Sequence, residues 1–176
     1  FFHQAALAGN PELEDFFTEE YTLNHLLHRY SKPVIAFMDG IVMGGGMGIA
    51  QGARMRIATE RTKMAMPETN IGLFPDVGGG FFLGRGPGHL GEYLALTGHM
   101  LHGAQAVQAG LADGVLASEK QRALWDSLPT LSRPDPHSVR AWIGEHLQTS
   151  TGTTIAPAGS VDRFFGLPTV GAIVHA

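Results

Sequence analysis

The sequence predicts an α/β fold in which short strands alternate with helices, and three observations support this. Apolar residues recur at helical spacing between residues 11 and 30. An uninterrupted apolar run of strand length follows at 34–38. The same alternation then continues, with strands expected at 55–58, 64–66 and 115–117 and helices at 89–96, 103–109 and 139–147.

Prolines and glycines set the boundaries of these elements. Pro33 ends the first helix, because proline disfavours helical backbone at the residue before it. Gly98 and Gly110 are expected to end the next two helices. The stretch 67–80 is rich in turn residues and lies between strands, where side chains for chemistry are often displayed. A Ser/Thr/Gly-rich loop is expected at 149–160.

The composition excludes several classes of protein. The 176 residues suffice for one domain with a hydrophobic core. A net charge of −4 argues against a nucleic-acid binder, which would carry a clustered basic face. The absence of cysteine excludes disulfides and thiolate metal sites and fits a cytoplasmic location. Charged residues make up only 16%, which fits either a surface covered by another partner or a glycine-rich enzyme core.

Three consecutive glycines, Gly44, Gly45 and Gly46, follow an apolar run and precede a helix expected at 49–53. Backbone N–H groups at a helix N-terminus lack intrahelical partners and carry partial positive charge. The segment can therefore bind a phosphate or an oxyanion formed in acyl transfer, or it can be a tight turn against a strand. A dinucleotide site is disfavoured, because the spacing is not G-x-G-x-x-G and no phosphate-loop lysine follows.

Two carboxylates, Glu68 and Asp76, stand in the turn-rich stretch. Two carboxylates near one pocket can divide the roles of acid, base and nucleophile. Alternatively, they are solvated loop residues, or Asp76 caps a helix. The histidines, including the pairs His25/His28 and His99/His102, lack a third ligand nearby and no H-E-x-x-H occurs, so we interpret them as surface or capping residues and expect no metal.

Taken in order, these segments resemble the crotonase superfamily, which includes the enoyl-CoA hydratases and isomerases. The resemblance covers roughly residues 19–118. The matching segments are K-P-V-I-A at 32–36, D-G at 39–40, G-G-G at 44–46, M-P-E at 66–68, G-L-F-P at 72–75 and L-T-G at 96–98.

Within the superfamily, the chain most resembles the 3-hydroxyisobutyryl-CoA hydrolase branch. The strings M-P-E-T at 66–69 and I-G-L-F-P-D-V-G-G-G at 71–80 are similar to that branch almost letter for letter. E-E-Y at 19–21 with L-N at 23–24, and V-D-R-F-F at 161–165, also resemble its segments. Typical hydratases carry a Glu where Gly48 stands here and a small residue where Asp76 stands.

The resemblance implies a crotonase-type spiral of repeated β-β-α units, of which this chain is a fragment. Residues 1–118 would be part of the crotonase core, without the upstream oxyanion loop, and 119–176 the start of a C-terminal helical region. It also implies an acyl-CoA thioester hydrolase acting on a 3-hydroxyacyl-CoA such as 3-hydroxyisobutyryl-CoA. No cofactor is expected, since coenzyme A is part of the substrate, and a homo-oligomer such as a trimer is expected.

The resemblance also assigns roles to residues. Gly45 would donate its N–H to the thioester oxygen, within a substrate-binding segment formed by Gly44, Gly45 and Gly46. Glu68 would attack the carbonyl or act as general base on water, and Asp76 would position the substrate hydroxyl or share in proton transfer. Glu20 would orient the substrate. Two alternatives remain: an enoyl-CoA hydratase or isomerase with Glu68 as acid/base, and a non-catalytic crotonase-fold scaffold.

Overall fold

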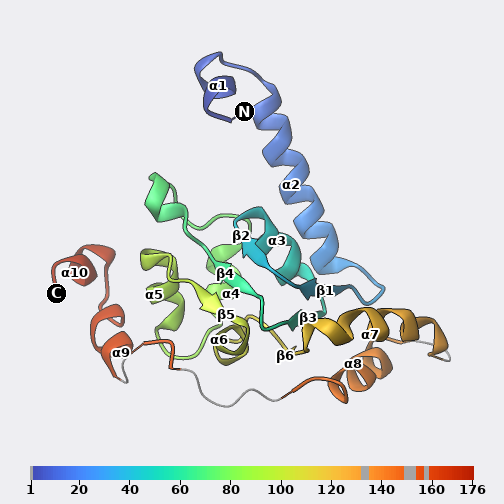
Figure 1. Cartoon of the computed structure of the whole chain (residues 1–176). Helices are drawn as coiled ribbons and strands as arrows, with labels where there is room; N and C mark the ends of the chain where they lie inside the picture. The colour runs from blue at the N-terminus through green and yellow to red at the C-terminus, as the bar shows by residue number, and fades with distance from the viewer. Residues whose placement is uncertain (1, 132–134, 149–153, 157–158) are drawn as a thin grey trace.

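Two small sheets form the centre of the molecule (Figure 1). This computed structural model describes residues 2–131, 135–148, 154–156 and 159–176. In the first sheet, β1 (Ile35–Met38), β3 (Met55–Ala58) and β6 (Gly114–Val115) are parallel in the order β1-β3-β6. In the second, β4 (Lys63–Ala65) pairs parallel with β2 (Ile41–Met43) and antiparallel with β5 (Leu101–His102).

The order of the strands along the chain makes a spiral. β1 lies in the first sheet and β2 in the second, a helix follows, and β3 and β4 then repeat the alternation one strand further along each sheet. This is the β-β-α repeat that the resemblance implies, and the mixed α/β class predicted from the sequence is confirmed.

Hydrogen bonds join one turn of the spiral to the next. The corner between β1 and β2 holds Asp39, and the corner between β3 and β4 holds Thr59 and Arg61. The Thr59 hydroxyl and the Arg61 Nε–H each donate to Asp39 Oδ1 at 2.8 Å. The backbone N–H of Lys63 donates to the Gly40 carbonyl at 2.8 Å. The two corners are therefore held in register where the chain passes between sheets.

Helices surround the two sheets. α2 (Glu12–Arg29) is the longest and extends away from the sheets toward α1 (Phe2–Leu7), while its C-terminal part packs on α3 (Gly45–Gly52) (Figure 1). The remaining helical segments are η1 (Glu68–Ile71), α4 (Gly79–Leu83), α5 (Leu90–Thr97), α6 (Gly103–Gln108), η2 (Ser118–Lys120), α7 (Gln121–Ser127), η3 (Leu128–Thr130), α8 (Pro136–Gly144), α9 (Ser160–Phe165) and α10 (Val170–Val174).

Buried apolar side chains form two clusters on either side of β3. One includes Met47, Met64 and Leu101 and lies among α3, β4 and α5. The other includes Ile57 of β3 and Ile143 of α8, both fully buried. Burial of these side chains removes apolar surface from water, the dominant favourable contribution to folding. The first cluster lies directly under the start of α3, so it fixes the segment that carries the glycine triplet.

The structure departs from the expected elements in a few places. α3 begins at Gly45 rather than at Ile49, because Gly44 at φ 50° and ψ −122° already serves as its N-cap. Glycine has a low helix propensity, so the triplet alone does not predict helix. η1 lies within the stretch expected to be turns, and α4 begins at its end. The two-residue β5 is too short for a periodic pattern. The loop expected at 149–160 falls largely outside the described residues, and the division of the chain at residue 118 stays a prediction.

No helix in the described ranges has both the length and the apolar character needed to cross a membrane.

Asp113 joins β3 to the segment that leads into β6. Its carboxylate accepts from the Arg56 backbone N–H at 2.8 Å, from the Arg56 guanidinium at 3.1 Å and from Arg140 at 3.3 Å. The Asp113 side chain is only 10% exposed. Asp113→Ala should lower the free energy of unfolding by about 2–4 kcal/mol, because the mostly buried Arg56 guanidinium loses its only carboxylate partner among the described residues.

The matched control for Asp113 is Asp126, whose partner Arg122 is 84% exposed. Asp126→Ala should change the free energy of unfolding by less than about 1 kcal/mol, as surface ion pairs contribute little. Urea unfolding of both variants measures the difference. Equal losses would contradict the structural role of Asp113.

Candidate active site

Glu68 is a buried carboxylate at the start of η1. It directly follows Met66-Pro67 after β4 and is only 7% exposed. Its Oε2 atom is buried and has no hydrogen-bond partner within the described residues. Burial raises the pKa of the Glu68 carboxyl, and the nearby charge of Asp76 raises it further. A buried carboxyl of raised pKa, with one oxygen unpartnered, is a candidate for proton transfer.

The N-terminus of α3 lies between two carboxylates. A Cβ atom built on Gly44 would lie 3.3 Å from Glu68 Oε1, and one built on Gly45 would lie 2.5 Å from Glu20 Oε1. The N–H groups of Gly45 and Gly46 donate to no acceptor in the described part of the chain. The start of α3 thus offers free donors beside Glu68, which is the arrangement that can bind a developing oxyanion.

Asp76 lies in a tight turn opposite α2. The Tyr21 hydroxyl donates to Asp76 Oδ2 at 2.9 Å, and the Gly79 N–H donates to the Asp76 carbonyl at 2.5 Å. The next residue, Val77, has a φ of 43°, a region that β-branched residues rarely adopt. Such strain often marks a functional segment. The charge of Asp76 also contributes, after burial, to raising the pKa of Glu20.

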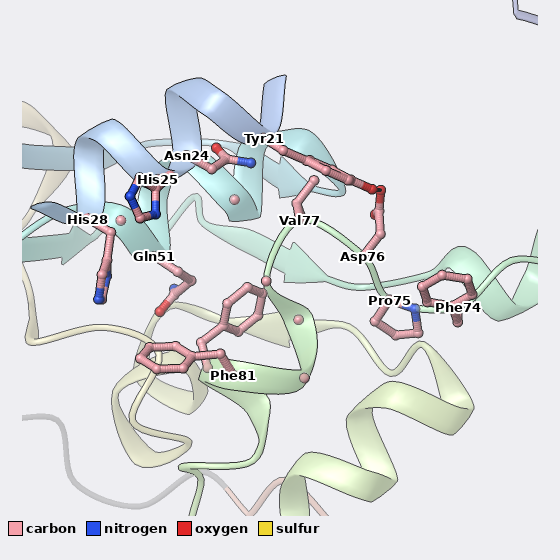
Figure 2. Close-up of a pocket in the computed structure, with 16 residues that line it drawn as sticks. Tyr21, Asn24, His25, His28, Gln51, Phe74, Pro75, Asp76, Val77 and Phe81 are labelled. Carbon is pink, nitrogen blue, oxygen red and sulfur yellow. Dashed lines mark hydrogen bonds between the residues drawn. The ribbon is translucent and has the colours of Figure 1, made fainter. Parts of the chain in front are cut away.

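A cavity of about 730 Å³ opens beside this turn (Figure 2). Asp76 lines it, whereas Glu20, Glu68 and Gly45 are not among its lining residues. α2, α3 and the segment 74–82 form its walls, with the lining residues Tyr21, Asn24, His25, His28, Gly48, Gln51, Gly52, Phe74, Pro75, Asp76, Val77, Gly78, Gly79, Gly80, Phe81 and Phe82.

Sequence reasoning missed the face of α2 that lines this cavity. Tyr21, Asn24, His25 and His28 follow the i, i+3, i+4, i+7 spacing of one helical face. The periodicity could have revealed them, but a polar face is ordinarily interpreted as solvated. His25 and His28 are exposed, as expected, and they also line the cavity. No group of residues suited to a metal ion occurs in the described ranges.

Gly48 has no room for the carboxylate that typical hydratases carry there. A Cβ at this position would lie 2.7 Å from Val77 Cβ and 2.8 Å from Asn24 Nδ2. Val77 directly follows Asp76, so the space left by Gly48 admits the turn that carries Asp76. Gly48 and the turn that carries Asp76 and Val77 therefore pack directly against each other. The Asn24 amide fills the remaining space, buried and without a partner within the described residues.

Comparison with known proteins agrees with the crotonase-type fold. The enoyl-CoA hydratase/isomerase family matches residues 1–176. The chain belongs to this family. It is 50% identical, over 97% of its length, to a protein of Xenopus tropicalis named 3-hydroxyisobutyryl-CoA hydrolase, mitochondrial, of which it covers 46%. It is also 53% identical, over 69% of its length, to the small ribosomal subunit protein mS47 of Neurospora crassa, of which it covers 24%.

Solved structures of the family superpose well on the chain. A carnitinyl-CoA dehydratase from Mycobacterium thermoresistibile gives a TM-score of 0.84 at 38% identity, covering 98% of this chain and 49% of that one. An enoyl-CoA hydratase from Rhodobacter sphaeroides gives 0.71 at 33% identity, covering 99% and 50%. The chain thus spans about half the length of the X. tropicalis protein and of these solved chains.

The packing at Gly48 predicts a stability difference within one helix. Gly48→Ala should lower the free energy of unfolding by about 1–3 kcal/mol, because the new methyl group overlaps Val77 and Asn24. Gly46→Ala is the matched control, since a Cβ there has no atom within 4 Å. That change should raise the free energy of unfolding by about 0.5–1 kcal/mol, because alanine is favoured over glycine in a helix by about this amount. Equal unfolding midpoints for both variants would contradict the packing.

The raised pKa of Glu68 predicts a pH-dependent stability. A carboxyl whose pKa is higher in the folded than in the unfolded state favours folding below the ordinary value of 4.5, and that contribution is lost as the pH rises through the folded pKa. Glu68→Gln carries no charge to bury. The variant should therefore have a higher Tm than the natural protein at pH 7–8, with the gain shrinking as the pH falls toward 4.5.

Asp135 is the control for this pH dependence. It caps α8, and the N–H and hydroxyl groups of Ser138 and the N–H of His137 lower its pKa. The contribution of Asp135 to stability is present above its ordinary pKa of 3.8 and is lost as the pH falls through its folded pKa. This pH dependence is the reverse of that of Glu68. Asp135→Asn should thus reduce Tm at neutral pH. If the gain in Tm of Glu68→Gln were the same at pH 8 and pH 4, the claim that burying the Glu68 charge destabilises the fold would be refuted.

Proposed function

We propose that the protein hydrolyses the thioester of a 3-hydroxyacyl-CoA such as 3-hydroxyisobutyryl-CoA. The observation that carries this proposal is the placement of the buried Glu68 carboxyl against the free N–H groups at the start of α3. An oxyanion site beside a proton acceptor is what thioester hydrolysis requires. The name of the X. tropicalis relative supports the substrate class.

In the proposed reaction, a water oxygen attacks the thioester carbonyl carbon. The Gly45 N–H, within the Gly44–Gly46 segment, donates to the developing oxyanion, a contribution of about 2.7–4 kcal/mol for a donor of this kind. Glu68 accepts the proton from the water, the C–S bond breaks, and the coenzyme A thiolate leaves with the proton that Glu68 returns to it. In the alternative route, the Glu68 carboxylate itself attacks the carbonyl carbon, and water then hydrolyses the resulting anhydride.

Two further carboxylates complete the proposed site. Asp76, at the edge of the cavity, would hold the substrate hydroxyl. Glu20, whose carboxylate reaches the first turn of α3, would orient the substrate there. The reaction as proposed needs no cofactor, because coenzyme A arrives as part of the substrate.

Hydration of an enoyl-CoA is the second candidate, since the superposed structures bear hydratase and dehydratase names. Glu68 would then be the acid/base. The packing at Gly48 argues against it, because Val77 and Asn24 occupy the place of the second hydratase carboxylate. A non-catalytic scaffold is the third candidate. It is supported by the 53% identity to a small ribosomal subunit protein.

The oligomeric state and the cellular location of the protein are also proposals. We expect a homo-oligomer such as a trimer, as the family resemblance implies. The composition pointed to the cytoplasm, whereas the X. tropicalis relative is named a mitochondrial protein. The cytoplasmic location therefore stays a prediction.

Two assays on the protein that carries this chain separate the three candidates. A hydrolase releases free thiol from 3-hydroxyisobutyryl-CoA, a hydratase consumes the enoyl absorbance of crotonyl-CoA, and a scaffold does neither. We expect thiol release, and Glu68→Gln should lower its kcat by at least about 100-fold, the low end of general acid–base contributions.

The control variant is Glu92→Gln, which changes a half-exposed carboxylate on α5 and should leave kcat within about twofold. Rapid hydration of crotonyl-CoA without thiol release would replace the hydrolase proposal with the hydratase. Near-natural turnover in folded Glu68→Gln would end the role of Glu68.

A further inference from the structure

We propose that Tyr21 is a positioning residue for the reaction, holding the Asp76 carboxylate in its working orientation through one hydrogen bond. This inference rests on the proposed hydrolase function and adds a residue to it. Tyr21 would touch no reacting atom. It would act by leaving Asp76 Oδ1 available while Oδ2 is engaged.

The geometry places the two groups across the mouth of the cavity. The Tyr21 hydroxyl, projecting from α2, donates to Asp76 Oδ2 at 2.9 Å across 55 positions of sequence (Figure 2). Both residues line the cavity. Among the described residues, Tyr21 is the one hydrogen-bond donor to this carboxylate. The bond thus links the helix on one wall to the turn on the other.

The turn itself does little to fix the Asp76 side chain. Leu73 and Phe74 before it are 58% and 72% exposed, so packing on that side is sparse. The backbone is set by the Val77 conformation and by the Gly79 N–H, but these fix the main chain and not the carboxylate rotamer. A carboxylate with free rotamers would lose entropy on binding substrate, and a donor from a rigid helix removes that cost in advance.

The Tyr21–Asp76 hydrogen bond also holds Asp76 in place against repulsion by neighbouring carboxylates. The carboxylates of Glu20 and Glu68 lie close enough to Asp76 to interact with it electrostatically, and both repel it. A neutral donor can hold Asp76 there without cancelling its charge. Burial and the contact with Asp76 raise the pKa of Tyr21 to about 12, so its proton is present throughout the neutral range. The ring is steadied by Phe17, whose centroid lies 6.2 Å away.

The test is a double-mutant cycle on thiol release from 3-hydroxyisobutyryl-CoA. Tyr21→Phe keeps the ring and removes only the hydroxyl. It should lower kcat about tenfold while KM stays within about twofold, and in an Asp76→Asn background it should lower kcat by less than about twofold. Tyr30→Phe, at the end of the same helix, should leave kcat unchanged. A natural kcat in Tyr21→Phe, or a full tenfold loss in both backgrounds, would overturn the proposal.

A readout that needs no turnover separates this inference from the hydrolase function. The carboxyl carbon of Asp76, observed by NMR and assigned with Asp76→Asn, should shift in Tyr21→Phe and not in Tyr30→Phe. If the natural protein releases no thiol, the hydrolase proposal is overturned, and the role of Tyr21 in that reaction is overturned with it. If thiol is released but the Asp76 signal ignores Tyr21→Phe, the positioning role alone is overturned.

Discussion

The close approach of α2 to α3 is the constraint on which the rest of the site depends. Gly45, Gly48 and Gly52 lie on one face of α3, at the spacing that keeps them on a single side of a helix. Added Cβ atoms there would lie 2.5 Å from Glu20, 2.8 Å from Asn24 and 3.1 Å from Leu27. Because this face carries no side chains, α2 can pack directly on the α3 backbone.

That contact explains why a helix with no buried residue can position polar groups. The C-terminal half of α2 is held by its close packing on the α3 backbone, and not by a stripe of buried apolar side chains. The side of α2 that faces the site can therefore carry polar residues, which are Glu20, Tyr21, Asn24, His25 and His28. The same glycines leave the first N–H groups of α3 uncovered. One packing solution therefore supplies both the donors for an oxyanion and the polar wall opposite Asp76.

Much of this organisation could be predicted from the sequence, and the remainder depends on contacts between distant segments. The strand at 35–38 follows from an apolar run and the strand at 55–58 from alternation. The roles of Glu68 and Asp76 come from the family resemblance and stay a prediction. The start of α3 at Gly45 could not be predicted, because glycine disfavours helix unless tertiary packing compensates. The Tyr21–Asp76 bond spans 55 positions, and no local pattern encodes it.

The contact between Gly48 and the Val77 turn limits what position 48 can carry. A carboxylate on α3 and the Val77 turn cannot occupy the same space, since even a Cβ at position 48 would lie 2.7 Å from Val77. Because position 48 carries no side chain, the Val77 turn and the Asn24 amide both reach the α3 backbone there. Asp76 directly precedes Val77, so this packing also sets where the Asp76 carboxylate stands. It lies at the edge of the cavity, where the Tyr21 hydroxyl of α2 donates to it.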